Sequence, residues 1–157
     1  MAISTYPASS SGGPAGDAWT LITSSSPTGT SAYTGSISTP YKKIRLVLKG
    51  TSMNSNTTWS VQVNSAAATY TAVIGGTGFT YGMNTIDLCG TASQGAVDAE
   101  LVFTNADGST PKEFSGWSTK AGHIKGAVYS NAAISSISVL NPGNTWTGGT
   151  IYIYGAN

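Results

Sequence analysis

The sequence predicts an all-β fold, an antiparallel β-sandwich of jelly-roll-like form with an extended N-terminal arm. Apolar and polar residues alternate over short runs, and turn residues separate these runs. No window of helical length carries an apolar stripe with a period of 3.6 residues. Alternation with a period of two is typical of antiparallel strands that bury one face. The 157 residues suit one domain that is long enough to bury a core.

The first part of the chain is predicted to be an arm, residues 1–17, and the sandwich domain is predicted to span residues 18–157. The arm contains "ASSSGGPAG", a composition typical of flexible linkers, which bury too little apolar surface to fold alone. Its sizeable apolar residues are Ile3, Tyr6 and Pro7. We expect these three residues to dock on a neighbouring subunit or a larger assembly.

The strands of the domain are predicted in order from Trp19. The first run, "AWTLITSS" at 18–25, alternates weakly, whereas the later runs align their apolar residues on one face. These later runs are 41–50, 58–64, 69–74, 84–90, 96–104, 122–130, 134–140 and 149–155. The segment "NADG" at 105–108 is expected to form a hairpin turn.

The composition gives no electrostatic argument for nucleic acid or a membrane as a partner. The net charge is +1, and only 8% of the residues are charged. Lys43, Arg45 and Lys49 share one strand face, which we interpret as a solvated face rather than a basic binding patch. The single cysteine, Cys89, excludes an intrachain disulfide and is interpreted as a small buried hydrophobe. The first residues show no pattern of a signal peptide.

The titratable residues favour a protein that is not an enzyme. His123 is the single histidine, and no motif of an activated nucleophile surrounds it. Asp98 and Glu100 share a strand face, and a solvated outer face is favoured over a glycosidase pair. Asn105 and Asp107 could contribute to a calcium loop, but a plain turn is favoured. We therefore expect no catalytic residue, no metal and no cofactor.

The aromatic residues are the candidates for a contact surface. Trp117 and Trp146 are predicted to lie in loops, where they would anchor a neighbouring subunit. Packing within the chain and stacking on a sugar ring are the alternatives for these two residues. The terminal strand turns Ile151 and Ile153 to the core, which leaves Tyr152 and Tyr154 for a second surface. A homotrimer would supply that surface.

Two motifs give the chain a resemblance to a known group of proteins. The first is "Tyr-x-x-Ile-x-Leu-x-Leu", here Tyr41, Ile44, Leu46 and Leu48. The second is the terminal "Gly-Thr-Ile-x-(Ile/Leu)-Tyr-Gly", here Gly149, Thr150, Ile151, Ile153, Tyr154 and Gly155. In the order of its elements the chain resembles the small β-sandwich modules of bacteriophage virions, which occur in tail-fibre tips and in head decoration or cement proteins.

The resemblance implies a non-enzymatic virion structural protein, made in the host cytoplasm and carried on the virion. The favoured function is that of a trimeric decoration or cement protein that clamps neighbouring capsid subunits. Its partners would be copies of itself and the major capsid protein or another virion protein. The alternatives are the receptor-binding tip of a phage tail fibre and a carbohydrate-binding module.

Overall fold

The computed structural model of the chain describes residues 18–55, 58–64, 69–74, 79–88 and 95–157. For residues 69–74 and 79–83 it describes the backbone alone. The expected arm at 1–17 therefore lies outside the described residues, as does Cys89.

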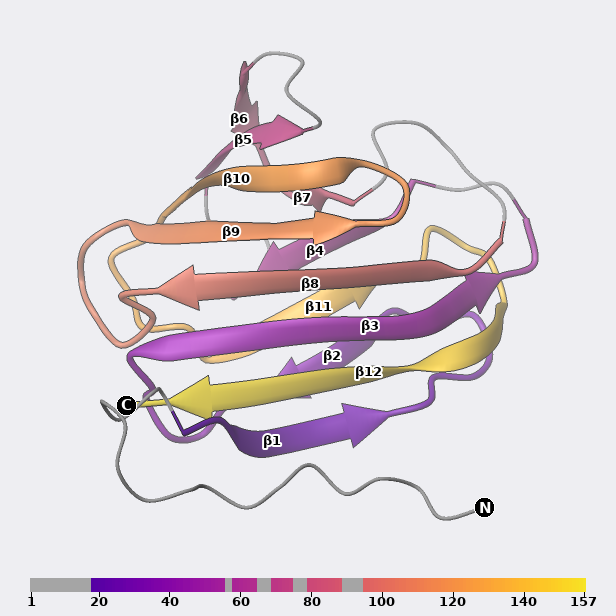
Figure 1. Cartoon of the computed structure of the whole chain (residues 1–157), viewed down its shortest axis with the longest axis horizontal. Helices are drawn as coiled ribbons and strands as arrows, with labels where there is room; N and C mark the ends of the chain where they lie inside the picture. The colour runs from indigo at the N-terminus through magenta and orange to yellow at the C-terminus, as the bar shows by residue number, and fades with distance from the viewer. Residues whose placement is uncertain (1–17, 56–57, 65–68, 75–78, 89–94) are drawn as a thin grey trace, which may run out of the picture.

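The described residues form strands and connecting turns, with no helix among them (Figure 1). All the strand pairs are antiparallel. The larger sheet has eight strands in the order β1-β12-β3-β8-β9-β10-β5-β6, and the smaller has four in the order β2-β11-β4-β7. The bounds in chain order are β1 Thr20–Ser25, β2 Tyr33–Ser36, β3 Lys43–Met53, β4 Ser60–Val63, β5 Thr69–Ile74, β6 Phe79–Met83, β7 Ile86–Asp87, β8 Val97–Thr104, β9 Lys112–Ser118, β10 Gly122–Tyr129, β11 Ser136–Leu140 and β12 Trp146–Ala156.

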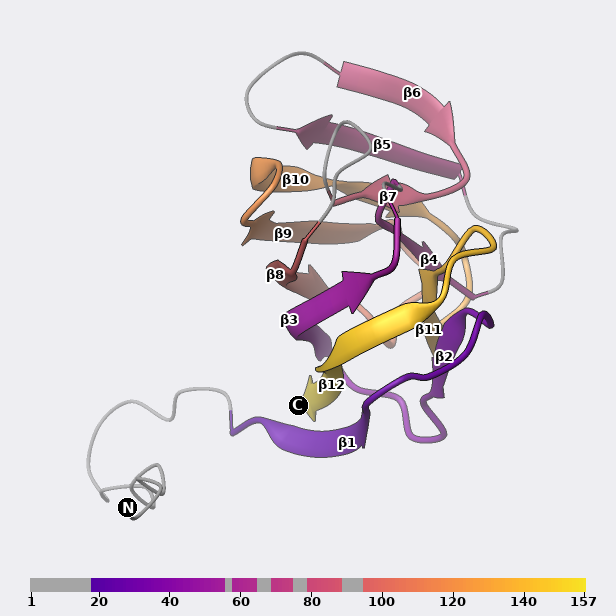
Figure 2. The same ribbon diagram turned by 90° about the vertical axis from the view of Figure 1, so that its right-hand side faces the viewer.

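The two sheets form separate layers, which the side view in Figure 2 shows next to each other. In Figure 1 the eight-stranded sheet is nearer the viewer, with β2, β4 and β11 behind it. The prediction of an all-β antiparallel β-sandwich is confirmed. The finer jelly-roll-like assignment stays a prediction.

The core lies between the sheets and follows from the alternation in the sequence. Strand β8 is the clearest case, because buried and partly exposed residues alternate strictly along all eight of its positions. The inward residues of β3, β8, β10, β11 and β12 are almost entirely buried. Trp59 and Trp146 meet edge to face, with ring centroids 5.7 Å apart. Such aromatic contacts add about 0.5–1.5 kcal/mol to the burial of the rings.

Two predictions of local structure are wrong. Trp117 lies in β9 and Trp146 opens β12, although both were placed in loops. The neighbouring glycines misled the prediction because here they serve close approach between strands rather than turns. A Cβ on Gly116 would lie 1.8 Å from the carbonyl oxygen of Glu100 on β8. Strands β2, β6 and β9 are not among the predicted runs.

The two motifs of the resemblance meet in space. A Cβ on Gly155 would lie 2.4 Å from Cγ of Tyr41, so the tyrosine ring rests directly on the glycine backbone. Gly149 has a positive φ of 91°, and a Cβ there would lie 2.3 Å from the Cα of Thr51 on β3. Both glycines are therefore required by packing of β12 against its surroundings.

The predicted turn at "NADG" is confirmed. The N–H of Gly108 donates to the carbonyl of Asn105 at 3.1 Å, and Asn105 adopts a left-handed conformation with φ of 55°. The turn also shapes a buried site for Lys112, whose Nζ donates to the carbonyls of Gly108, Thr110 and Ser130 at 2.7, 3.1 and 2.7 Å. These bonds offset part of the cost of burying an ammonium group. Burial lowers the pKa of Lys112, and nearby Asp107 opposes that shift.

Candidate interaction surface

The outer face of the eight-stranded sheet carries most of the predicted contact residues that the structure describes. Its register defines two rows of outward side chains that cross six strands, from β1 to β10 (Figure 1). The first row is Leu21, Tyr154, Arg45, Val102, Ser115 and Lys125. The second row is Ser24, Tyr152, Val47, Glu100, Trp117 and His123.

Large apolar side chains are exposed on this face. Among the described residues, the large hydrophobic side chains with high exposure are Leu21 at 50%, Trp117 at 46% and Tyr129 at 49%. Leu21 and Trp117 belong to the two rows, and Tyr129 points outward from β10, four residues after Lys125. Three strands separate Leu21 on β1 from Trp117 on β9, so the exposed apolar side chains are spread over this face and do not form one contiguous patch.

Tyr152 and Tyr154 lie where the alternation of the terminal strand predicts. Ile151 and Ile153 are fully buried, and the two tyrosines are half-buried on the opposite face. Their rings stack on one another with centroids 6.2 Å apart. The guanidinium of Arg45 lies 5.9 Å from the centre of the Tyr154 ring. These contacts hold both rings in place on the outer face.

Charges on this face are arranged by strand. Lys43, Arg45 and Lys49 project from β3, while Asp98 and Glu100 project from β8. Arg45 donates to Glu100 at 2.7 Å across the boundary between these strands. The carboxylate of Asp98 accepts the backbone N–H of Gly50 at 2.6 Å. The expectation of an outer position for both carboxylates is confirmed.

The described titratable residues do not converge on a reaction centre. His123 is exposed on β10 and is paired in register with Trp117. Glu100 is engaged by Arg45 and Asp98 by Gly50, so both carboxylates already have partners. No group of three or more His, Cys, Asp or Glu side chains lies close enough to hold a metal ion in the part of the chain that the structure describes.

Trp146 differs from the expectation of a contact residue. It is 5% exposed, its indole N–H donates to the carbonyl of Ser31 at 2.8 Å, and its backbone N–H donates to Gly29 at 3.0 Å. Through these two bonds, Trp146 on β12 holds the loop that connects β1 and β2. Packing within the chain, the alternative given for it above, is what the structure shows.

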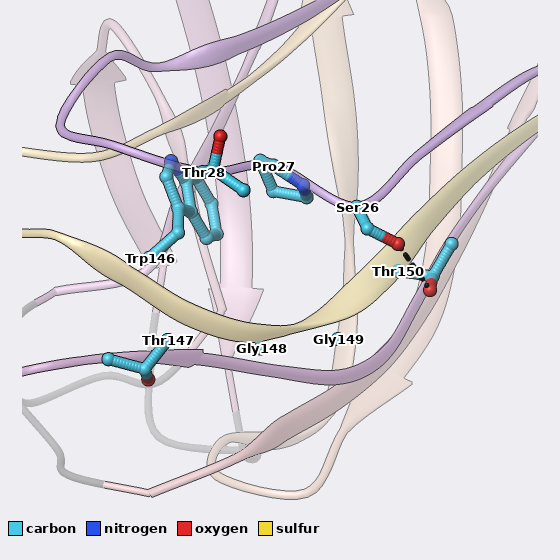
Figure 3. Close-up of a pocket in the computed structure, with 8 residues that line it drawn as sticks. All are labelled: Ser26, Pro27, Thr28, Trp146, Thr147, Gly148, Gly149 and Thr150. Carbon is cyan, nitrogen blue, oxygen red and sulfur yellow. Dashed lines mark hydrogen bonds between the residues drawn. The ribbon is translucent and has the colours of Figure 1, made fainter.

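A shallow groove of about 410 Å³ lies beside Trp146 (Figure 3). It is lined by Ser26, Pro27, Thr28, Trp146, Thr147, Gly148, Gly149 and Thr150. The hydroxyls of Ser26 and Thr150 bond to each other at 3.1 Å, and Thr147 bonds to Ser52 at 2.8 Å. These hydroxyl groups already have hydrogen-bond partners, and the indole of Trp146 is buried. The groove therefore presents fewer groups that can bind a ligand than the outer face does.

The remaining predicted contact residues, Ile3, Tyr6 and Pro7, lie outside the described residues. Sequence reasoning missed Leu21, Val47, Val102 and Tyr129 as members of the outer face. The signal was present in part, because each is an apolar residue on the polar side of an alternating run. Only the register between strands shows that they lie on one surface.

None of the described residues forms a helix that is long and apolar enough to cross a membrane. Comparisons of the chain with protein-family models, with curated proteins and with solved structures find no match.

Proposed function

We propose that this chain is a non-enzymatic structural protein of a bacteriophage virion. It would act as a homo-oligomer, expected to be a trimer, that decorates the capsid and clamps neighbouring capsid subunits. The observation that carries the proposal is the outer face of the eight-stranded sheet, with exposed Leu21, Trp117 and Tyr129 beside half-buried Tyr152 and Tyr154. Tryptophan and tyrosine are the usual anchors of protein interfaces.

The charge and chemistry of this face agree with the proposal. The carboxylates of Asp98 and Glu100 already accept hydrogen bonds within the chain. His123 is exposed on β10, opposite Trp117 on β9. A surface of small hydroxyl residues with few charges suits a chain whose flanks are covered by neighbours. The resemblance to virion modules gives the biological setting of the assembly.

The first test is the mass of the purified chain in solution, measured by light scattering. We expect three times the 15.9 kDa of one chain. The second test is mass spectrometry of virus particles from the culture that produces the protein, followed by antibody labelling in electron microscopy. Labelling over the head supports a decoration protein, labelling at the fibre ends supports the receptor-binding tip, and absence from particles refutes the proposal.

A carbohydrate-binding module is the second candidate, because the exposed Trp117 ring could stack on a sugar. A monomer of 15.9 kDa that is retarded in gels containing a polysaccharide would favour this function. Substitution of Trp117 by alanine should then abolish the retardation.

A further inference from the structure

The outer face of the eight-stranded sheet divides into two halves of opposite charge. The basic half consists of β12 and β3, with Lys43, Arg45 and Lys49 beside Tyr152 and Tyr154. The acidic half consists of β8 and β9, with Asp98, Glu100 and Glu113 beside Trp117. Beyond the acidic half, β10 adds Lys125 and His123, and Glu113 is diagonal to Lys125.

We propose that this face binds a second copy of the same chain, with the basic half of one copy lying against the acidic half of the next. The inference rests on the proposed function, because both require a homo-oligomer, and it names the surface and the partner. It applies whether two copies meet face to face or three close a ring.

Charge complementarity determines which halves meet. Contact between two basic halves, or between two acidic halves, would bring like charges together and is disfavoured. Contact between unlike halves places Lys49, which is exposed, near Asp98 of the next copy, and Lys43 near the exposed Glu113. The ion pair of Arg45 with Glu100 inside one copy shows the same pairing of β3 with β8 charges.

The apolar content of the face supplies the attraction. Leu21 and Tyr129 mark the two outer parts of the face, Trp117 lies in the acidic half, and Val47 and Val102 lie between them. Each fully buried side chain of this kind contributes about 1.5–3 kcal/mol. Aromatic residues such as Trp117 and Tyr129 are enriched in protein interfaces, whose rims are polar.

The size of the face suits a stable contact. Six strands at about 4.8 Å spacing span about 24 Å, and seven residues along a strand span about 23 Å. The projected area is therefore about 550 Å², and the accessible area of an uneven surface is larger than its projection. A standard interface buries about 800 Å² on each partner. When two copies meet face to face, the face can thus hold most of one interface of this class, whereas in a ring each contact uses one half of it.

The decisive experiment is zero-length cross-linking with a carbodiimide on a mixture of unlabelled and ¹⁵N-labelled protein. A cross-link between one unlabelled peptide and one ¹⁵N-labelled peptide joins two different copies, and we call such a product a mixed peptide. We expect such mixed peptides to join Lys43 or Lys49 to Asp98, Glu100 or Glu113. Mixed peptides that involve only other surfaces, in a protein that is oligomeric, would overturn the inference and leave the proposed function standing.

A matched pair of variants tests the same contact. W117K removes the aromatic anchor and places a positive charge in the acidic half, where the basic half of the next copy would repel it. Self-association should weaken at least tenfold, which corresponds to the loss of one interface anchor. S36K adds the same charge at an exposed site of β2 on the other sheet and should leave association unchanged. If W117K and S36K change the strength of self-association equally, the inference is overturned. If W117K does not fold, cross-linking of the wild-type protein decides the question alone.

A monomeric wild-type protein would also overturn the inference, and the presence of the chain in virus particles would then decide the proposed function separately. Retardation of that monomer by a polysaccharide, lost in W117K, would assign the face to a glycan instead.

Discussion

Replacing Gly155 by alanine should destabilise the domain through a single contact. Gly155 lies in β12, and its missing side chain leaves the space in which the Tyr41 ring rests. An added Cβ would lie 2.4 to 2.5 Å from Cγ, Cδ1 and Cδ2 of that ring. Carbon atoms in contact normally stay about 3.5–4.0 Å apart, so the ring must move by about 1 Å or more.

The expected loss of stability is that of overpacking, about 1–3 kcal/mol. For a domain of this size, each kcal/mol lowers the melting temperature by about 4 °C, so a fall of about 4–12 °C is expected. The effect of G155A on stability should change sign once the Tyr41 ring is removed. In a Y41A background the clash is absent, and alanine inside a strand is favoured over glycine by about 0.5–1 kcal/mol.

The assay is urea unfolding of the wild-type protein, the two single variants and the double variant, which gives the coupling energy directly. G108A is the control, because the nearest atom to its Cβ would lie 3.5 Å away, an ordinary contact. If G155A costs as much in the Y41A background as in the wild type, the contact between the two motifs is not what requires the glycine.

Three further changes should alter stability in different ways. G149A should cost at least about 3 kcal/mol in urea unfolding, because a positive φ and a clash with the β3 backbone occur together. K112M should cost about 2–4 kcal/mol, since three carbonyls lose their donor, whereas K125M at an exposed site should change little. Burial raises the pKa of Asp87 above its ordinary value of 3.8, and one of its oxygens is buried without a hydrogen bond. The folded state therefore holds this proton more tightly, so the contribution of Asp87 to stability is fully present below pH 3.8 and is lost as pH rises through the raised pKa. D87N should remove that part of the pH dependence and stabilise the domain at pH 7, as unfolding at pH 4 and pH 7 would show.

Alternation along each run was enough to predict which residues enter the core. The alternation in runs 41–50 and 96–104 aligns Ile44 with Leu46 and Leu101 with Phe103, and all four are fully buried. Spacing succeeds here because side chains of a strand alternate strictly between the two faces of the sheet. The turn at 105–108 was predicted for an equally local reason, since its residues favour the conformations that the turn requires.

The outer face could not be predicted because it is defined by register and not by any local run. Trp117 and Tyr152 lie in the same row only because β9, β8, β3 and β12 pair in that order. The sequence carries no local signal for that order. Gly116 shows the related difficulty, because a glycine that permits close approach of two strands has the same sequence signature as a glycine in a turn.

The terminal strand therefore has two separable roles. Its buried face, Ile151 and Ile153, belongs to the core, so shortening either side chain should lower stability by about 0.5–5 kcal/mol. Its outer face, Tyr152 and Tyr154, is partly buried within the chain and belongs to the surface proposed to meet another copy. Substitutions on the two faces should consequently affect different measurements, unfolding for the isoleucines and self-association for the tyrosines. A terminal strand with large aromatic residues on its outer side is explained if that side is covered in the assembled protein, because exposed aromatic area has no stabilising role in an isolated domain.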